Sequence, residues 1–299
     1  MTRLPIIVNP VAGGGRARRA AARVAALLRA DGIAVDLLET SGPGHARQLA
    51  GSLVRDGVPR VVACGGDGTQ HEVMSALTGT GAVLGILPFG RGNDLAKAMG
   101  VPGDIAAATG ILRTGAIRRI DVGYANGTPF CTVASAGFDA EISNLTRTGF
   151  WRHLGPLTYP LGVVVGLLRL RVPMMRVEGD FGVREGRYIL VAASNTGLYG
   201  GGIRIAPDSV PDDGLFDCCL VRDIPRWKLL TIFPKAYSGR HVRHPEVEVV
   251  RSRALRITAV PDTPVIADGE SVGRTPLDVT LRSRALAVLV PAGSPAPGF

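Results

Sequence analysis

Lysine is scarce in this chain. Only three of its 34 basic residues are lysines, so the formal net charge of +9 rests on arginine. Such an excess suits an anionic partner, whether a nucleotide, a nucleic acid or an acidic membrane surface. Aromatic residues make up only 5% of the chain, and no basic run carries the interleaved aromatics that stack on bases. We therefore expect no nucleic-acid partner.

Long apolar runs and metal-binding spacings are also missing. The longest apolar stretch, LTYPLGVVVGLLRL, is shorter than the roughly 20 residues that span a bilayer. The apolar run of the N-terminal segment MTRLPIIVNP is too short for a signal peptide, and the segment is predicted to form a strand. The four cysteines show no C-x-x-C spacing, and no HExxH motif occurs. These absences predict a soluble protein with reduced thiols.

The first 120 residues alternate between strand-like and helix-like segments. Strands are predicted at residues 4–8, 33–38 and 60–64, and helices at 16–30, 44–56 and 69–78. AVLGILPF adds a strand before a helix that begins near Asp94. This alternation predicts an α/β domain over residues 1–122, with a parallel sheet and ligands at the carboxyl ends of its strands.

The pattern changes near residue 121. DVGYANGTPF holds an Asn-Gly turn between two strand-like runs, which predicts a hairpin. Further extended segments are predicted at 128–135, 174–179, 187–193, 216–221, 246–251, 254–260, 277–281 and 286–290. They indicate an antiparallel β-rich domain over residues 123–290, a β-sandwich, followed by a loose tail at 291–299. Residues 141–171 are predicted to be helical, and 150–170 fit either a core helix or a membrane-contacting lid.

CGGDGT is a glycine-rich turn between a predicted strand and a predicted helix. Its glycines permit tight backbone near a phosphate, yet the turn also contains the carboxylate of Asp67. Asp67 fits either a turn aspartate or an acid that faces polyphosphate through a divalent cation. Thr69 and Glu72 have the T-x-x-E spacing of a capping box, which gives both a structural interpretation.

Two more glycine-rich loops follow strands in the same way. NPVAGGGRA lacks the G-K-[ST] ending of a Walker A loop and does not fit G-x-G-x-x-G. With LPFGRGNDLA it should lie along the same edge of the sheet as CGGDGT. The edge would then carry Asn9, Gly13, Gly66, Gly90 and Asn93.

The order and spacing of these loops resemble the diacylglycerol kinase catalytic domain family, which includes bacterial soluble lipid kinases and sphingosine kinases. The resemblance rests on NPVAGG, GGDGTQHEV and LPFGRGND, followed by DVG, YGGGIRIAPDSVPDDGLFD and ADGE, and it runs from about residue 3 to residue 290. GGDGT alone is less specific, since NAD kinases and phosphofructokinases have related loops. The family implies ATP bound between the two domains and transfer of its γ-phosphate to a lipid hydroxyl.

The resemblance also assigns residues. Glu270 of ADGE would be the catalytic base, and Asp67 would be a second catalytic residue that faces phosphate through Mg²⁺. Asp94 and Asp121 would belong to the acidic network on the substrate side. Arg91 stands where many members have threonine, and it could bind phosphate or point to solvent. The implied nucleotide contacts are Asn9, Pro10, Val11, Ala12, Gly13, Thr40, Gly66, Asp67, Gly68, Thr69, Gln70, His71, Glu72 and Arg91.

PDSVPDDGLFD supplies several acids, and Asp213-Gly214 alone would form a hairpin turn. By resemblance it would hold a structural Mg²⁺ through the Asp213 carboxylate and the backbone carbonyls of Val210 and Leu215. Glu270 could likewise be an exposed residue of the Asp268-Gly269 turn, and Asp94 a helix-start acid.

The function expected from the resemblance is an ATP- and Mg²⁺-dependent kinase acting on diacylglycerol or a similar lipid alcohol. It would be cytoplasmic, touch the inner face of the membrane transiently, and could form a homodimer. Two alternatives stay open: an NAD kinase-like enzyme with a soluble substrate, and a non-catalytic nucleotide- or lipid-binding protein.

Overall fold

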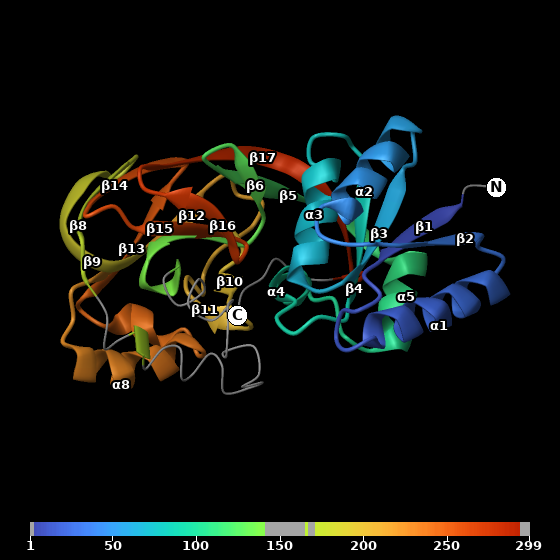
Figure 1. The fold of residues 1–299 in the computed structure, drawn as a ribbon, viewed down its shortest axis with the longest axis horizontal. Helices are drawn as coiled ribbons and strands as arrows, with labels where there is room; N and C mark the ends of the chain where they lie inside the picture. The colour runs from blue at the N-terminus through green and yellow to red at the C-terminus, as the bar shows by residue number, and fades with distance from the viewer. Residues whose placement is uncertain (1–2, 141–164, 167–170, 294–299) are drawn as a thin grey trace.

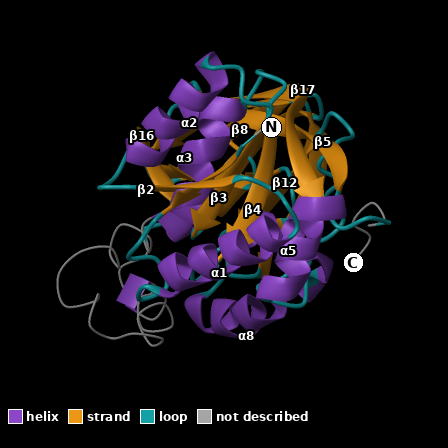
Figure 2. Cartoon of the chain, turned by 90° about the vertical axis from the view of Figure 1, so that its right-hand side faces the viewer, coloured by secondary structure: helices purple, strands orange, loops and turns teal. Residues whose placement is uncertain are grey.

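The N-terminal half is an α/β layer structure. The computed structural model describes residues 3–140, 165–166 and 171–293. The strands β1 (Leu4–Val8), β2 (Val35–Glu39), β3 (Arg60–Gly65) and β4 (Val83–Pro88) pair in parallel in the order β2-β1-β3-β4. On one face lie α2 (His45–Arg55) and α3 (Asp67–Leu77), and on the other α1 (Arg16–Ala30) and α5 (Ile105–Thr114) (Figure 2). The predicted parallel α/β domain is confirmed.

The sequence explains these elements simply. Every residue of β1 is buried, as a central parallel strand covered on both faces requires. In α1 the buried residues recur at helical spacing and include Ala17, Ala21, Val24 and Leu28. Small alanines on this face let the helix approach the sheet closely, while its arginines stay at the surface.

The C-terminal half is antiparallel β-structure packed face to face, as predicted (Figure 1). Its sheet runs β16-β15-β7-β9-β8-β14, and β12 joins β9 to β13. Phe130 stacks on Phe216 inside it, with ring centroids 5.7 Å apart. The bounds are β7 (Val133–Gly137), β8 (Met174–Gly179), β9 (Gly182–Ser194), β12 (Phe216–Arg222), β13 (Val247–Ser252), β14 (Ala254–Val260), β15 (Pro264–Ala267) and β16 (Glu270–Arg274).

One long strand, β17 (Leu277–Val290), joins the two halves (Figure 1). Separate strands at 277–281 and 286–290 were predicted, but they form one strand with an irregular register between Arg282 and Leu286. Its first part pairs with β14, and its last part runs parallel to β4, where Ala287 lies opposite Val83. β5 (Ala116–Ala125) pairs with it along most of its length. The end of the chain therefore completes the N-terminal sheet and fixes the halves relative to each other.

Shorter elements frame the space between the halves. The predicted Asn126-Gly127 hairpin joins β5 to β6 (Thr128–Phe130), and both turn residues have positive φ. α4 (Asp94–Ala98) follows the third glycine-rich loop, and β10 (Leu198–Tyr199) and β11 (Ile203–Arg204) form a small ribbon opposite it.

One helix was not expected from the sequence. α8 (Arg226–Ala236) lies in the β-rich half and is followed by a 3-10 turn at Arg240–Arg243. The helical stretch predicted at 141–171, with its alternative as core or lid, falls mostly outside the described residues. Within the described residues, no helix has both the length and the apolar character needed to cross a membrane.

Candidate active site

Three glycine-rich loops meet at the carboxyl ends of the parallel strands. A Cβ on Gly90 would lie 2.2 Å from Cα of Gly66, so the second and third loops touch backbone to backbone. Gly13 has φ +59°, and a Cβ there would lie 2.4 Å from the carbonyl oxygen of Phe89. Only glycine fits such approaches. The predicted shared edge is thus present, with Thr40 at the end of β2 beside it.

The acid in the second loop has a structural task. The Asp67 carboxylate accepts hydrogen bonds from the backbone N–H groups of Asn93 (2.8 Å) and Asp94 (2.7 Å). It thereby ties the start of α3 to the start of α4. A Cβ on Gly92 would lie 2.5 Å from one oxygen of Asp67, which explains the glycine. This carboxylate therefore holds the second and third glycine-rich loops together.

The capping-box interpretation of Thr69 and Glu72 is wrong. Helix α3 begins at Asp67, so both residues lie inside it. Glu72 instead accepts the backbone N–H groups of Gly44 (2.8 Å) and Ala46 (2.9 Å), and so caps α2. The hydroxyl of Thr69 accepts a hydrogen bond from the Asn9 amide at 3.4 Å, linking the first loop to the second.

Asp94 connects the two halves. Its carboxylate oxygens accept the backbone N–H of Gly201 at 3.1 and 2.9 Å, and the Lys97 ammonium donates to the Gly201 carbonyl at 3.0 Å. Burial raises the pKa of Asp94 to about 6, against the lowering effect of the Gly201 hydrogen bond. The YGGG segment therefore docks onto α4 through backbone groups.

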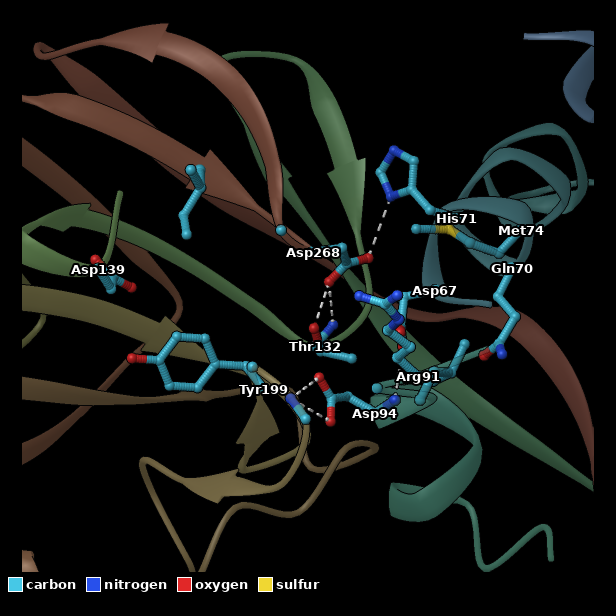
Figure 3. A pocket seen from close by; sticks show the side chains of 16 residues that line it. Asp67, Gln70, His71, Met74, Arg91, Asp94, Thr132, Asp139, Tyr199 and Asp268 are labelled. Carbon is cyan, nitrogen blue, oxygen red and sulfur yellow. Dashed lines mark hydrogen bonds and ion pairs between the residues drawn. The ribbon is translucent and has the colours of Figure 1, made fainter. Parts of the chain in front are cut away.

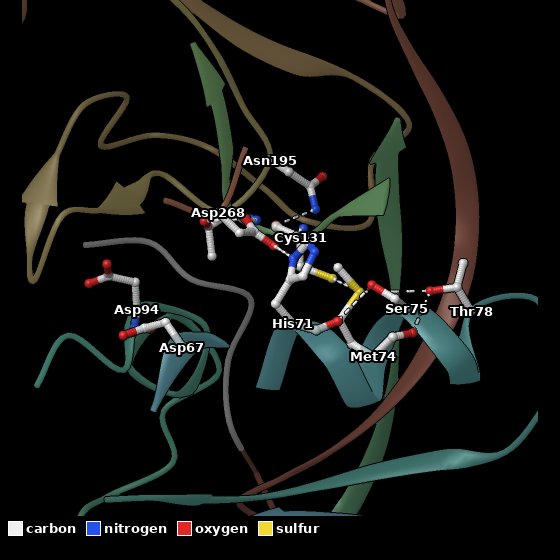
Figure 4. A network of polar contacts seen from close by, with 10 residues as sticks. Asp67, His71, Met74, Ser75, Thr78, Asp94, Cys131, Asn195 and Asp268 are labelled. Carbon is white, nitrogen blue, oxygen red and sulfur yellow. Dashed lines mark hydrogen bonds and ion pairs between the residues drawn. The ribbon is translucent and has the colours of Figure 1, made fainter. Parts of the chain in front are cut away.

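A second connection joins α3 to the ADGE turn (Figure 4). Asp268, at φ +48°, accepts the N–H of Cys131 (2.9 Å) and the N–H and hydroxyl of Thr132 (2.8 and 2.6 Å). Nδ1 of His71 lies 3.3 Å from the same carboxylate. Burial raises the pKa of Asp268, but the contacts with His71, Thr132 and Cys131 outweigh it and hold the pKa below its usual value.

Glu270 follows this turn as the first residue of β16. Its Oε1 lies 3.9 Å from the point where a Cβ on Gly68 would stand. The glutamate assigned as the base thus faces the GGDGT loop across the gap between the halves. Its neighbours Asp268 and Gly269 line the cavity described next, and Glu270 itself is not among the lining residues.

A cavity of about 470 Å³ lies between these groups (Figure 3). Arg91 points into it, which places the unusual arginine among carboxylates. Of the predicted nucleotide contacts, Asp67, Gln70 and His71 also line it. The full lining is Asp67, Gln70, His71, Met74, Arg91, Gly92, Asp94, Leu95, Thr132, Asp139, Tyr199, Gly200, Gly201, Ile266, Asp268 and Gly269.

A second, apolar cavity of about 70 Å³ adjoins the first. Asp139 and Tyr199 line both, and the Tyr199 ring points toward Asp139 (Figure 3). Burial raises the pKa of Asp139 to about 6, although the Ser135 hydroxyl donates to it at 2.6 Å. The remaining lining is Phe138, Ile189, Leu190, Ile203, Ile205, Val221, Leu229, Ile232, Phe233, Ala236, His241 and Val247.

Asp213, the carboxylate assigned to a structural magnesium ion, has other partners. One oxygen of Asp213 accepts the N–H of Leu215 at 3.0 Å, and the other contacts the Arg251 guanidinium. Asp121 is fully buried and accepts the N–H groups of Gly214 and Arg284, both at 2.7 Å. Among the described residues, no group of three or more His, Cys, Asp or Glu side chains could hold a metal ion. The predicted set of one carboxylate and two backbone carbonyls is a different kind of group, so the magnesium site stays a prediction, and we derive no step from it.

Comparison with known proteins agrees with the geometry. Residues 3–125 match the diacylglycerol kinase catalytic domain, and residues 132–290 match the YegS C-terminal NAD kinase beta sandwich-like domain. A diacylglycerol kinase from Mycobacterium tuberculosis (strain CDC 1551 / Oshkosh) is 35% identical over 95% of this chain and 94% of its own. The chain belongs to the diacylglycerol kinase family.

Other relatives extend this result. A diacylglycerol kinase from Staphylococcus aureus (strain MRSA252) is 27% identical to this chain, and the match covers 97% of this chain and 92% of the relative. A crystal structure of a diacylglycerol kinase from Bacillus anthracis str. Sterne superposes with a TM-score of 0.76, covering 99% of this chain and 98% of that chain. At 23% identity, that likeness shows the shared fold.

Several residues of this candidate site were not singled out from the sequence. Asp139 lies in the apolar run VASAGFDA, where an isolated acid is a signal for a buried functional carboxylate. Gly201 acts through its backbone, so only the YGGG run hinted at a close approach. His71 was assigned to the nucleotide, and its contact with Asp268 depends on a pairing between the halves that sequence spacing does not reveal.

Proposed function

We propose that this kinase transfers the γ-phosphate of ATP to the hydroxyl of diacylglycerol or a related lipid alcohol. The observation that supports this best is the junction of two cavities. A carboxylate-rich cavity beside the glycine-rich loops adjoins an apolar one, with Asp139 and Tyr199 in the walls of both. A lipid alcohol has the matching chemistry, since its reacting hydroxyl is attached to an apolar body.

For the nucleotide, the proposal uses the loops at the carboxyl edge of the parallel sheet. The first turn of α3 offers backbone N–H groups and the positive end of the helix dipole to phosphate. Arg91 adds a cation, the one guanidinium that the described residues contribute to this cavity. We therefore propose that Arg91 binds phosphate, and that the loop from Asn9 to Gly13 and Thr40 flank the rest of the nucleotide.

For the acceptor, Glu270 takes the proton of the lipid hydroxyl while the hydroxyl oxygen attacks the γ-phosphorus of ATP. The bond from that phosphorus to the bridging oxygen breaks, and ADP leaves. This role is consistent with the position of Glu270 opposite Gly68. Asp268 acts as a positioning residue, because its hydrogen bonds to Cys131 and Thr132 hold the turn from which Glu270 projects.

Mg²⁺ that enters with the nucleotide would neutralise phosphate charge. Asp67 and Asp94 fit that ion chemically, since hard cations prefer carboxylate oxygens and both carboxylates line the cavity. Their hydrogen bonds to backbone N–H groups orient them, and each carboxylate oxygen has a second lone pair for a ligand.

The rival proposal is an NAD kinase-like enzyme. The reason to consider it is that residues 132–290 match an NAD kinase beta sandwich-like domain. A soluble dinucleotide has no group that needs an apolar cavity beside the acceptor site. The lining of that cavity by Ile203, Leu229 and Ile232 therefore favours the lipid.

The proposal is tested with ATP labelled at its γ-phosphate and separate acceptors: diacylglycerol, monoacylglycerol, sphingosine, ceramide, phosphatidylglycerol and NAD. Lipids are supplied in vesicles, with Mg²⁺ present. We expect label in diacylglycerol or another lipid alcohol. Label only in NAD would replace the proposal with its rival, and no transfer to any acceptor would favour a binding protein.

A further inference from the structure

Helix α8 has an apolar ridge on its outer face. Trp227, Leu230 and Tyr237 are 69%, 51% and 47% exposed. With Pro234 they follow the spacing i, i+3, i+7 and i+10, which places them on one side of the helix. Exposed apolar side chains grouped in this way mark an interaction surface.

The inner face of the same helix points into the protein. Leu229, Ile232 and Ala236 are buried and line the apolar cavity next to the candidate active site. α8 lies at the outer edge of the C-terminal half, away from the α/β half (Figure 1). A single helix thus separates the apolar cavity from the exposed ridge.

The charged residues of the helix and of the 3-10 turn that follows it have one sign. Residues 224–245 include Lys228, Lys235, Arg240 and Arg243 and contain no Asp or Glu. These four cations form no ion pair with any residue that the structure describes, and two of them are among the three lysines of the chain.

We propose that the outer face of α8, with the 3-10 turn that follows it, docks onto a bilayer that contains anionic lipids. Tryptophan and tyrosine suit the boundary between acyl chains and headgroups, and flanking lysines and arginines attract an acidic surface. Docking on this face brings the apolar cavity next to the membrane that holds the lipid substrate. This inference rests on the proposed lipid kinase function, to which it adds the docking surface.

The test is sedimentation of the full-length protein with vesicles of phosphatidylcholine alone or mixed with phosphatidylglycerol, without ATP. The wild type should bind the mixed vesicles and bind the neutral ones far less. The double variant Trp227→Glu/Leu230→Glu should bind the mixed vesicles at least about tenfold more weakly, because two apolar side chains no longer leave water. The double variant Lys228→Gln/Lys235→Gln, which keeps the ridge, should lose much of the preference for anionic vesicles.

The matched control is Ile117→Glu/Val260→Glu. It adds the same two charges at positions that are 54% and 76% exposed and lie outside α8. It should bind as the wild type does. Equal binding by the α8 variant and the wild type would overturn the proposal. A wild type that binds neither kind of vesicle would also overturn the proposal and would point to a different partner. A wild type that binds the neutral and the mixed vesicles equally would overturn it too.

A second readout separates this inference from the kinase proposal. Phosphoryl transfer to a short-chain diacylglycerol in detergent micelles should be the same in the Trp227→Glu/Leu230→Glu variant and the wild type, because neither residue lines a cavity. A wild type that binds vesicles but transfers no phosphate to lipid would sink the kinase proposal alone. A selective loss of micelle activity in the α8 variant would count against a pure docking role.

Discussion

At the scale of single residues, carboxylates in this site do different work according to their partners. Asp67 and Glu72 accept backbone N–H groups and hold loops and helices together. Asp139 is buried and accepts hydrogen bonds from Ser135 and Ala140, and Glu270 faces the glycine-rich loop. These environments lead to separate predictions.

Glu270→Gln removes the proposed proton acceptor and keeps the side-chain shape. We expect the turnover number to fall by roughly 10² to 10⁴, the usual contribution of a general base, with ATP affinity and melting temperature unchanged. Steady-state kinetics and nucleotide titration measure this. Glu185→Gln, an exposed residue paired with Arg176, is the control. Wild-type turnover in Glu270→Gln would remove Glu270 from the role of base.

Asp139→Asn should change how stability depends on pH. Burial raises the folded-state pKa of Asp139 to about 6, above the ordinary 3.8, so the folded protein favours the protonated acid. The stability gained from this group is complete below about pH 4 and is lost as pH rises through about 6. The Asn variant lacks this loss. Between pH 4 and pH 8 its stability relative to that of the wild type should therefore rise by up to about 3 kcal/mol.

Urea unfolding of both proteins between pH 4 and pH 8 measures this effect. Asp94 also has a pKa raised to about 6, but its contribution is common to both proteins and cancels in the difference. A difference in unfolding free energy that is constant across this range would contradict the account of Asp139.

At the scale of elements, α2 depends on a residue from another helix. It has no side-chain cap of its own, and Glu72 of α3 supplies acceptors for the N–H groups of Gly44, Ala46 and Arg47. Glu72→Ala should therefore destabilise the protein by about 1 kcal/mol, as loss of a helix cap does. Urea unfolding at neutral pH is the measurement.

Glu39→Ala is the comparison for this cap. Glu39 forms an exposed ion pair with Arg18, and such pairs contribute little. We expect a change of less than about 0.5 kcal/mol. Equal losses in Glu39→Ala and Glu72→Ala would show that the cap has no special effect.

The local pattern of apolar residues and turns was enough to predict most helices and strands, but it did not predict which of them contact each other. β1 and α1 have the expected bounds because apolar periodicity and glycine turns are local signals. α8 was missed because its inward and outward faces are both apolar, so Lys228, Thr231 and Lys235 form only a narrow polar strip between them. The capping-box prediction failed because the helix begins at Asp67, two residues before the expected start, with Gly66 as its N-cap.

At the scale of the whole molecule, the site is formed by contacts between residues far apart in the sequence. Spacing along the sequence does not predict such contacts. Asp94 meets Gly201, and His71 meets Asp268, only because β17 returns to the first sheet and fixes the halves together. The sequence indicated the three loops and the resemblance indicated Glu270. The adjoining apolar cavity and Asp139 emerged from the fold alone.

In the proposed function, the junction of the two cavities directs phosphate to a lipid. The most direct measurement is a competition in one reaction, with γ-labelled ATP, Mg²⁺, diacylglycerol in vesicles and an equal concentration of NAD. We predict that label accumulates in phosphatidic acid in the lipid extract. Label that appears in NADP and not in the lipid extract would contradict the claim.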